Sequence, residues 1–195
     1  MYWHPALAVL SGVLAVAAII PYVRDIFRGT TRPNAVSWFL WTLLQGIALA
    51  AQVSAGASWS VVLLVVITIN TAAVTVLALI GYGYHAYGKT DFVCFVLALI
   101  AVAAWQATKD PVVAIGFAIF ADLFASVPTL VKALVDPASE SLLGWWIIMF
   151  ASLASVFSAN IVDVPNLAFQ IYMVFIDATT LGTLYIGWAR RQQIG

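Results

Sequence analysis

The feature that constrains this chain most is a series of long apolar runs. Several runs of 18 or more residues contain no Asp, Glu, Lys or Arg, and a helix of that length crosses the roughly 30 Å of hydrocarbon in a bilayer. Only 8% of the residues are charged, against about a quarter in soluble domains. We therefore expect an all-α integral membrane protein with seven transmembrane helices, at about 6–23, 35–54, 60–82, 92–108, 112–131, 142–160 and 166–188.

The basic residues predict how these helices are oriented. Cytoplasmic connections of membrane proteins are enriched in Lys and Arg. With the N-terminus outside, seven spans leave only Lys109 outside and place the other basic residues on the cytoplasmic side, namely Arg24, Arg28, Arg32, Lys89, Lys132, Arg190 and Arg191. No Lys or Arg precedes the first run, so we expect no cleaved signal peptide. The expected location is the cell membrane, with the C-terminus in the cytoplasm.

Two parts of the sequence repeat each other. The stretch 33–50 aligns with 137–154 at an offset of 104, and the helices on either side align at an offset of 107. A repeat of three helices, one linking helix and three more keeps both halves in the same orientation, as in parallel transporter repeats. The sequence thus predicts two parallel three-helix bundles, 1–88 and 111–195, joined by a linker helix in 89–110. The residue pairs that define the repeat are Pro21 with Pro128, Pro33 with Pro137, Trp41 with Trp145 and Asn70 with Asp177.

In this arrangement the chain resembles the SWEET and PQ-loop (MtN3-like) transporter superfamily. Members of that superfamily have prolines on the first two helices of each bundle, as at Pro21, Pro33, Pro128 and Pro137 here. They also have an Asn on the third helix of each bundle that lines the solute pocket, matched here by Asn70 and, as a carboxylate, by Asp177. The resemblance implies a transporter that works by alternating access. It implies no substrate class, because Pro-Tyr and Pro-Thr stand where the Pro-Gln dipeptide is expected.

Three polar residues lie near the middle of predicted spans: Asn70, Asp122 and Asp177. A charge at the bilayer centre costs about 2.5 to 3.5 kcal/mol on insertion scales, so such residues usually face the bundle interior and mark a pathway. We expect Asn70 and Asp177 to contact a solute, and Asp122, with Asp177, to couple a proton or a cation. No basic residue lies at that depth, so the acids need a proton, a cation, a cationic solute, or neutral donors such as Asn70, Thr179 and Thr180. The alternative is that both acids are protonated and only bond helices together.

Aromatic and amide side chains share one face of the second predicted helix, where Trp41 and Gln45 lie one turn apart. Together with Trp145 they could form the wall of a pocket for a flat or ring-shaped polar solute. Tryptophan in membrane proteins also serves as an interfacial anchor, which is the alternative here. The four repeat prolines are candidate gating hinges. Alternatively, Pro33 and Pro137 only begin the second and sixth helices.

The function predicted from these features is transport of a small polar solute through a midplane pocket, with proton or cation coupling. A non-transporting receptor or assembly protein and a cation channel remain alternatives. We expect no enzyme, because no Ser-His-Asp arrangement, HExxH, P-loop or GxGxxG occurs. A retinal protein would need a lysine in the last helix, which 166–188 lacks. No metal, cofactor or nucleic acid is expected. The predicted partners are the solute, the bilayer, and protons or a monovalent cation, and association into a homo-oligomer is left open.

Overall fold

The computed structural model describes residues 3–84 and 110–194 and, between them, only positions 88, 89, 92, 93, 95, 96, 99, 100, 103 and 107. The predicted fourth span (92–108) and the linker boundaries at 89–110 therefore lie largely outside the described residues. The described part is helical, with no strand in it. Its helices are α1 (Trp3–Phe27), α2 (Ala35–Ser54), α3 (Val61–Leu77) with a π-helical turn η1 (Ala78–Tyr82), α5 (Pro111–Val135), a short 3-10 turn η2 (Pro137–Ser139), α6 (Leu142–Ser158) and α7 (Val164–Ile194).

These helices agree with the predicted spans, apart from their ends. Five helical stretches are long and apolar enough to cross a membrane: α1, α2, α3 with η1, α5 and α7. Helix α6 is apolar but has 17 residues, or about 26 Å of helix. Its span was predicted to reach residue 160, but the helix ends at Ser158 and is followed by an extended residue, Ala159. The all-helical class with several membrane-length helices is confirmed.

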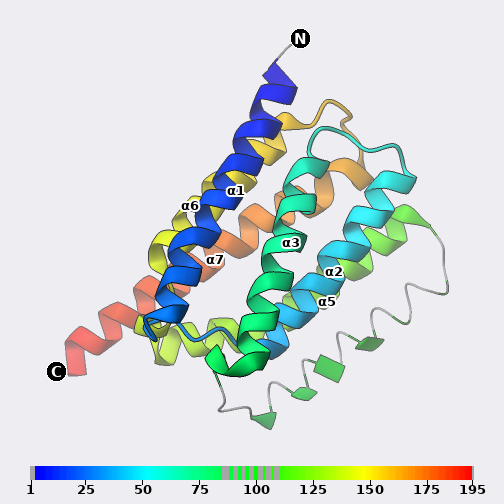
Figure 1. Ribbon diagram of the computed structural model, residues 1–195. Coiled ribbons are helices and arrows are strands. Elements are labelled where there is room, and N and C mark those ends of the chain that lie inside the picture. The colour runs from blue at the N-terminus through cyan, green and yellow to red at the C-terminus, as the bar shows by residue number, and fades with distance from the viewer. Residues whose placement is uncertain are drawn as a thin grey trace.

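Neighbouring helices pack in a regular order. Helix α3 packs against both α1 and α2, and these three helices form the first group. Helix α7 packs against both α5 and α6, and these form the second group. The two groups meet along α1 with α6 and along α2 with α5. Figure 1 shows α1, α3, α5 and α7 running from the end that holds the N-terminus to the other end, while α2 and α6 run back. We call the end where α1, α3 and α5 finish the basic end, since Arg28, Arg32 and Lys132 lie there.

The surface of the bundle is apolar and its interior holds charge. On α1 the residues Val9, Val13, Val16 and Ile20 follow one helical stripe and are each 50–64% exposed. By contrast, four charged side chains among the described residues are buried: Asp122, Lys132, Glu140 and Asp177. A soluble protein rarely exposes such a continuous apolar surface, whereas hydrocarbon favours it, so this distribution is the one expected of helices that span a membrane.

The prolines occupy two kinds of place. Pro21 and Pro128 lie inside α1 and α5, where each removes a helical hydrogen bond. Pro33 and Pro137 were predicted on the second and sixth helices, but both lie before them. Helix α2 begins after Pro33, because the Asn34 side chain accepts hydrogen bonds from the backbone N–H groups of residues 36 and 37 and caps the helix. Pro137 begins η2, and α6 starts only at residue 142.

Candidate functional site

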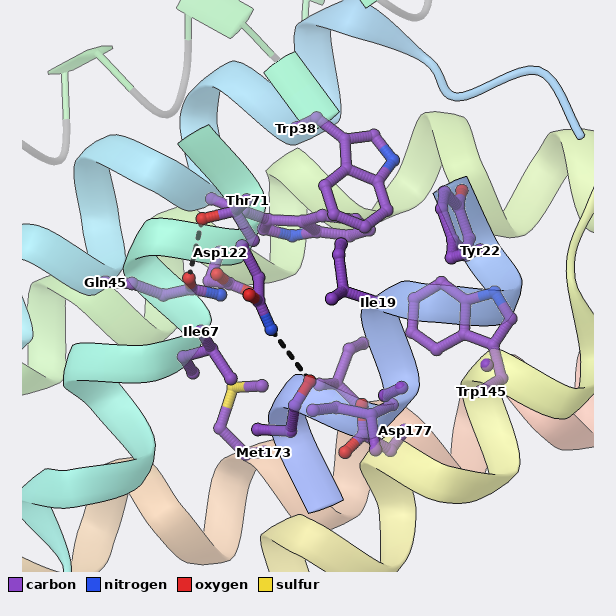
Figure 2. A pocket seen from close by; sticks show the side chains of 17 residues that line it. Ile19, Tyr22, Trp38, Gln45, Ile67, Thr71, Asp122, Trp145, Met173 and Asp177 are labelled. Atoms are coloured by element: carbon purple, nitrogen blue, oxygen red, sulfur yellow. Dashed lines mark hydrogen bonds between the residues drawn. The ribbon is translucent and has the colours of Figure 1, made fainter. Parts of the chain in front are cut away.

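A pocket lies inside the bundle at the level of the mid-helix polar residues. Side chains of α1, α2, α3, α5, α6 and α7 line it, and Figure 2 shows them converging on one space. The empty space, counted up to its opening, is about 690 Å³, which is an upper limit on what this conformation can hold. All the predicted solute and coupling residues border it, namely Trp41, Gln45, Asn70, Asp122, Trp145 and Asp177. The four repeat prolines are not among its lining residues.

Asp122 is held by hydroxyl groups from two helices. Its Oδ2 accepts a hydrogen bond from the Tyr172 hydroxyl of α7 at 2.6 Å and one from Ser126, one turn along α5, at 3.3 Å. The Trp41 indole N–H donates to Ser126 Oγ at 3.2 Å. The three donors thus form a network around a carboxylate that is 1% exposed. Its other oxygen, Oδ1, is buried and has no hydrogen-bond partner among the described residues.

Asp177 lies on α7 and accepts a hydrogen bond from Ser152 of α6 at 2.7 Å. The neutral donors expected for the two acids were different. Thr179 and Thr180 instead donate to backbone carbonyls of their own helix, at 2.8 and 2.9 Å. In a helix, a threonine hydroxyl reaches the carbonyl four residues earlier more easily than it reaches a neighbouring helix, so these two hydroxyls bond within α7 and not to the acids.

Asn70 and Gln45 are bonded within the first group of helices. The Asn70 amide donates to the Ala15 carbonyl of α1 at 2.8 Å, not to a carboxylate. Gln45 accepts a hydrogen bond from the Thr71 hydroxyl of α3 at 3.0 Å. Both residues border the pocket, so each fastens a wall helix while presenting the rest of its amide to the interior.

Four aromatic rings form a continuous series along the pocket. Tyr22 contacts Trp38, with ring centroids 4.9 Å apart. Trp38 contacts Trp41 at 5.2 Å and Trp41 contacts Trp145 at 6.1 Å, both edge to face. The series crosses from α2 to α6, so both groups of helices supply aromatic surface.

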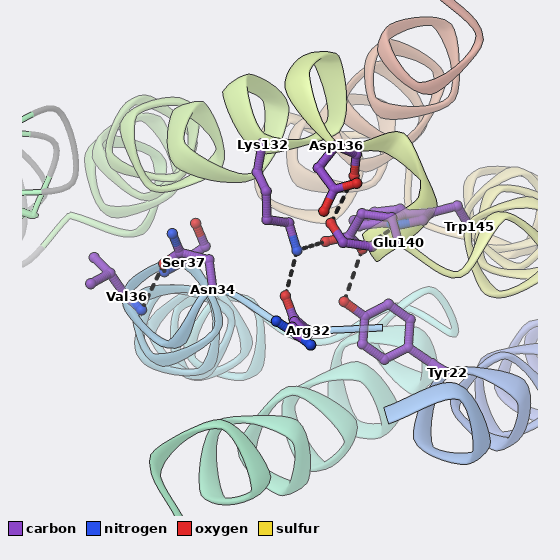
Figure 3. Close-up of polar contacts among 10 residues, drawn as sticks. Tyr22, Arg32, Asn34, Val36, Ser37, Lys132, Asp136, Glu140 and Trp145 are labelled. Atoms are coloured by element: carbon purple, nitrogen blue, oxygen red, sulfur yellow. Dashed lines mark hydrogen bonds and ion pairs between the residues drawn. The ribbon is translucent and has the colours of Figure 1, made fainter. Parts of the chain in front are cut away.

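A buried ion pair lies at the basic end of the bundle. Lys132 pairs with Glu140, and the Lys132 ammonium also donates to the Arg32 carbonyl at 2.5 Å. Glu140 accepts from the Tyr22 hydroxyl at 2.9 Å and from the Trp145 indole at 3.0 Å. We call these five residues the Lys132 cluster; Figure 3 shows it joining α1, α5, α6, the residue after η2 and the chain before α2. From the sequence, Lys132 served only to predict the orientation of the protein, and its ion pair with Glu140 was not predicted. The available signal was two acids, Asp136 and Glu140, that follow Lys132 closely in the sequence.

A second polar network, which the sequence analysis also missed, joins the helices toward the opposite end. Gln52 of α2 and Gln170 of α7 exchange side-chain hydrogen bonds of 3.2 and 3.3 Å. Beyond them, Asn166 accepts from the Ser58 backbone at 2.8 Å, and Ser60 donates to the Asn166 carbonyl at 3.1 Å. We call these five residues the amide network. It contains no charged residue, in contrast to the Lys132 cluster.

Neither metal chemistry nor a known relative defines the site. No group of three His, Cys, Asp or Glu side chains that could hold a metal ion occurs within the described residues. Comparisons with protein-family models, with curated proteins and with solved structures find no match to the chain. The function has to be inferred from the pocket itself.

Proposed function

We propose that this protein is a membrane transporter that moves a small polar solute by alternating access. The observation behind the proposal is a pocket that lies between two groups of helices and contains two buried carboxylates, Asp122 and Asp177. Buried acids at this depth are costly and usually mark a solute or ion pathway. Polar contacts that could break and re-form link the two groups on both sides of the pocket: the Lys132 cluster at one end and the amide network toward the other.

The packing order supports the two-bundle, 3+1+3 layout. Exchanging α1 with α5, α2 with α6 and α3 with α7 converts each of the packing pairs among these six helices into another observed pair. Two parallel three-helix repeats related by an axis along the membrane normal would produce this pattern. The layout is also that of the SWEET and PQ-loop superfamily, to which we propose a distant relationship.

A fourth span is supported by where its neighbours end. The Tyr84 backbone N–H donates to the Pro33 carbonyl at 2.8 Å, which fixes this part of the chain at the basic end. Asp110 caps the start of α5, where its side chain accepts from two backbone N–H groups. Since α5 runs toward the basic end and Lys132 lies near its last turn, Asp110 lies at the opposite end. Tyr84 and Asp110, the described residues on either side of the predicted fourth span, thus lie at opposite ends of the bundle, and the orientation proposed is N-terminus outside, C-terminus cytoplasmic.

Access to the pocket tests the proposal without knowledge of the solute. In a Cys94→Ala background, Ile148→Cys places one thiol at the pocket wall. In proteoliposomes, a membrane-impermeant thiol reagent should label it from either side, and without ionic conductance. Labelling from one side only would indicate the receptor alternative, and labelling from both sides with steady conductance would indicate the channel. Val13→Cys, on the exposed apolar stripe, is the matched control and should stay unlabelled.

Asp177→Asn should lower transport at least tenfold or change its pH dependence, while the folded yield stays at the wild-type level. The substitution keeps the shape of the side chain and removes its charge and its ability to take up a proton. The measurement is uptake by proteoliposomes of those solutes, from a panel of sugars, nucleosides, amino acids and amines, that the wild-type protein takes up. Thr179→Val is the control, because Thr179 lies on the same helix, is not among the pocket-lining residues, and its hydroxyl bonds only the backbone of its own helix. Equal uptake by Asp177→Asn and wild type would remove Asp177 from the pathway.

A further inference from the structure

The charges around the pocket are unbalanced, and this bears on the class of solute. Asp122 and Asp177 line it, whereas no Lys, Arg or His is found among its lining residues in the described part of the chain. Lys132 is the nearest basic residue along α5, but it lies ten residues from Asp122, about 15 Å along a helix. Its ammonium is already bonded to Glu140 and to the Arg32 carbonyl. Within the part of the chain that the structure describes, no basic side chain therefore serves as counter-charge to the two acids.

The hydrogen bonds around Asp122 are directed toward its carboxylate. Because the Trp41 indole can only donate, Ser126 Oγ accepts from it. The Ser126 proton is then free to point at Asp122 Oδ2, which also receives the Tyr172 hydroxyl. Donors arranged in this way stabilise negative charge on a carboxylate. Oδ1 of the same group is buried and has no hydrogen-bond partner within the described residues, and Asp122 is one of the residues that line the pocket.

Trp41 and Trp145 add aromatic surface to the pocket lining. The indole N–H groups of Trp41 and Trp145 are both used, one by Ser126 and one by Glu140. Trp41 and Trp145 therefore offer carbon edges and π faces to a solute, whereas the buried indole N–H of Trp38, which also lines the pocket, has no partner within the described residues. Ring faces attract organic cations, and the attraction is stronger where water is excluded.

We propose that the solute of this pocket is an organic cation without an acidic group, with its charged nitrogen between Asp122 and the tryptophan rings. The inference rests on the proposed transport function and specifies the substrate class of that site. An anion or a zwitterion would bring a carboxylate or phosphate for which the pocket has no basic partner. A bare metal ion would need several oxygen ligands, whereas most of the residues that line this pocket are apolar or aromatic. A neutral solute would leave the acids without a counter-ion.

Matched pairs of small molecules test the charge requirement. Choline, its neutral isostere 3,3-dimethylbutan-1-ol and its zwitterionic relative glycine betaine differ mainly in charge. The aromatic pair 1-methylnicotinamide and nicotinamide makes the same comparison for a flat ring. Binding to the purified full-length protein is measured by calorimetry and by the shift of the melting temperature, which rises with ligand that binds only the folded state. At least one cation should bind ten or more times more tightly than its neutral partner, and betaine should bind less tightly than choline.

Variants connect that preference to the pocket. Asp122→Asn should reduce the preference for the cation at least tenfold, and Asp177→Asn serves as the second variant if the first fails to fold. Asp136→Asn, an exposed acid outside the pocket, should leave it unchanged. Equal binding of charged and neutral partners, tighter binding of the neutral ones, or no binding of either cation would overturn the proposal. In each of these cases, thiol labelling of Ile148→Cys from both sides would still support a transporter. The proposal of an organic-cation solute can therefore be overturned while the proposal of transport stands.

Discussion

Replacing Glu140 by glutamine should lower the free energy of unfolding by about 3–5 kcal/mol, the cost of leaving one member of a buried ion pair without its partner. Lys132 and Glu140 have side chains that are 2% and 0% exposed. The glutamine could still accept from Tyr22 and Trp145, so the main loss is the charge that balances Lys132. SDS titration of the protein in mixed micelles measures the effect.

An exposed pair on the same side of the protein provides the control. Arg191 and Asp136 are 2.6 Å apart but 44% and 46% exposed, and exposed pairs contribute about 0–1 kcal/mol. Asp136→Asn should therefore change the free energy of unfolding little. The double variant Lys132→Met/Glu140→Gln should recover much of the stability lost in Glu140→Gln, since no unpaired charge is left. Equal effects of Glu140→Gln and Asp136→Asn would mean that water reaches the Lys132 cluster.

Gly187→Ala should also destabilise the protein, here through contact with backbone. A Cβ at this position of α7 would lie 2.5 Å from the Ala133 carbonyl oxygen, 3.1 Å from the Leu134 carbonyl oxygen and 3.2 Å from a ring carbon of Pro137. Backbone atoms cannot move aside as a side-chain end can, so α7 has to shift away from α5 and η2. Overpacking of this kind costs about 1–3 kcal/mol, measured by the same titration.

Gly182 on the same helix is the matched control for that substitution. A Cβ at Gly182 would meet nothing within 4 Å. Gly182→Ala should then be neutral or stabilise the helix by up to about 1 kcal/mol, because alanine loses less backbone entropy than glycine in a helix. If the two alanine variants had the same stability, close packing of α7 on α5 would not be a feature of the protein in solution.

Much of the fold could be predicted from the sequence, because hydrocarbon thickness fixes helix length and the uncharged runs are long. The positions of Asn70, Asp122 and Asp177 followed from the same argument, since depth depends only on how far along a span a residue lies. The depth of a residue in the membrane does not predict how its helix is rotated about its own axis. Tyr172 was not predicted to bond Asp122, although the distance is only 2.6 Å, because the direction of its hydroxyl depends on how α7 turns against α5.

Contacts formed by the segments that connect the helices were also not predicted from the sequence. The Lys132–Glu140 pair forms because η2 brings the chain back toward the last turn of α5, and a three-residue 3-10 turn has too little pattern to predict. The same holds for Ser58 and Asn166, which lie in or beside connections far apart in sequence. The start of α2 at residue 35 was predicted correctly, and the cap at Asn34, not Pro33, sets it.

The contacting tryptophan side chains along the pocket give the protein an intrinsic spectroscopic signal. Trp38 and Trp145 both touch Trp41, with ring centroids 5.2 and 6.1 Å away and interplanar angles of 74° and 79°. Indoles this close share their excited states, and the near-ultraviolet circular dichroism of such a group depends on the angles between its members. Any molecule that enters between them, or any motion that separates α2 from α6, must therefore alter that spectrum without an added label.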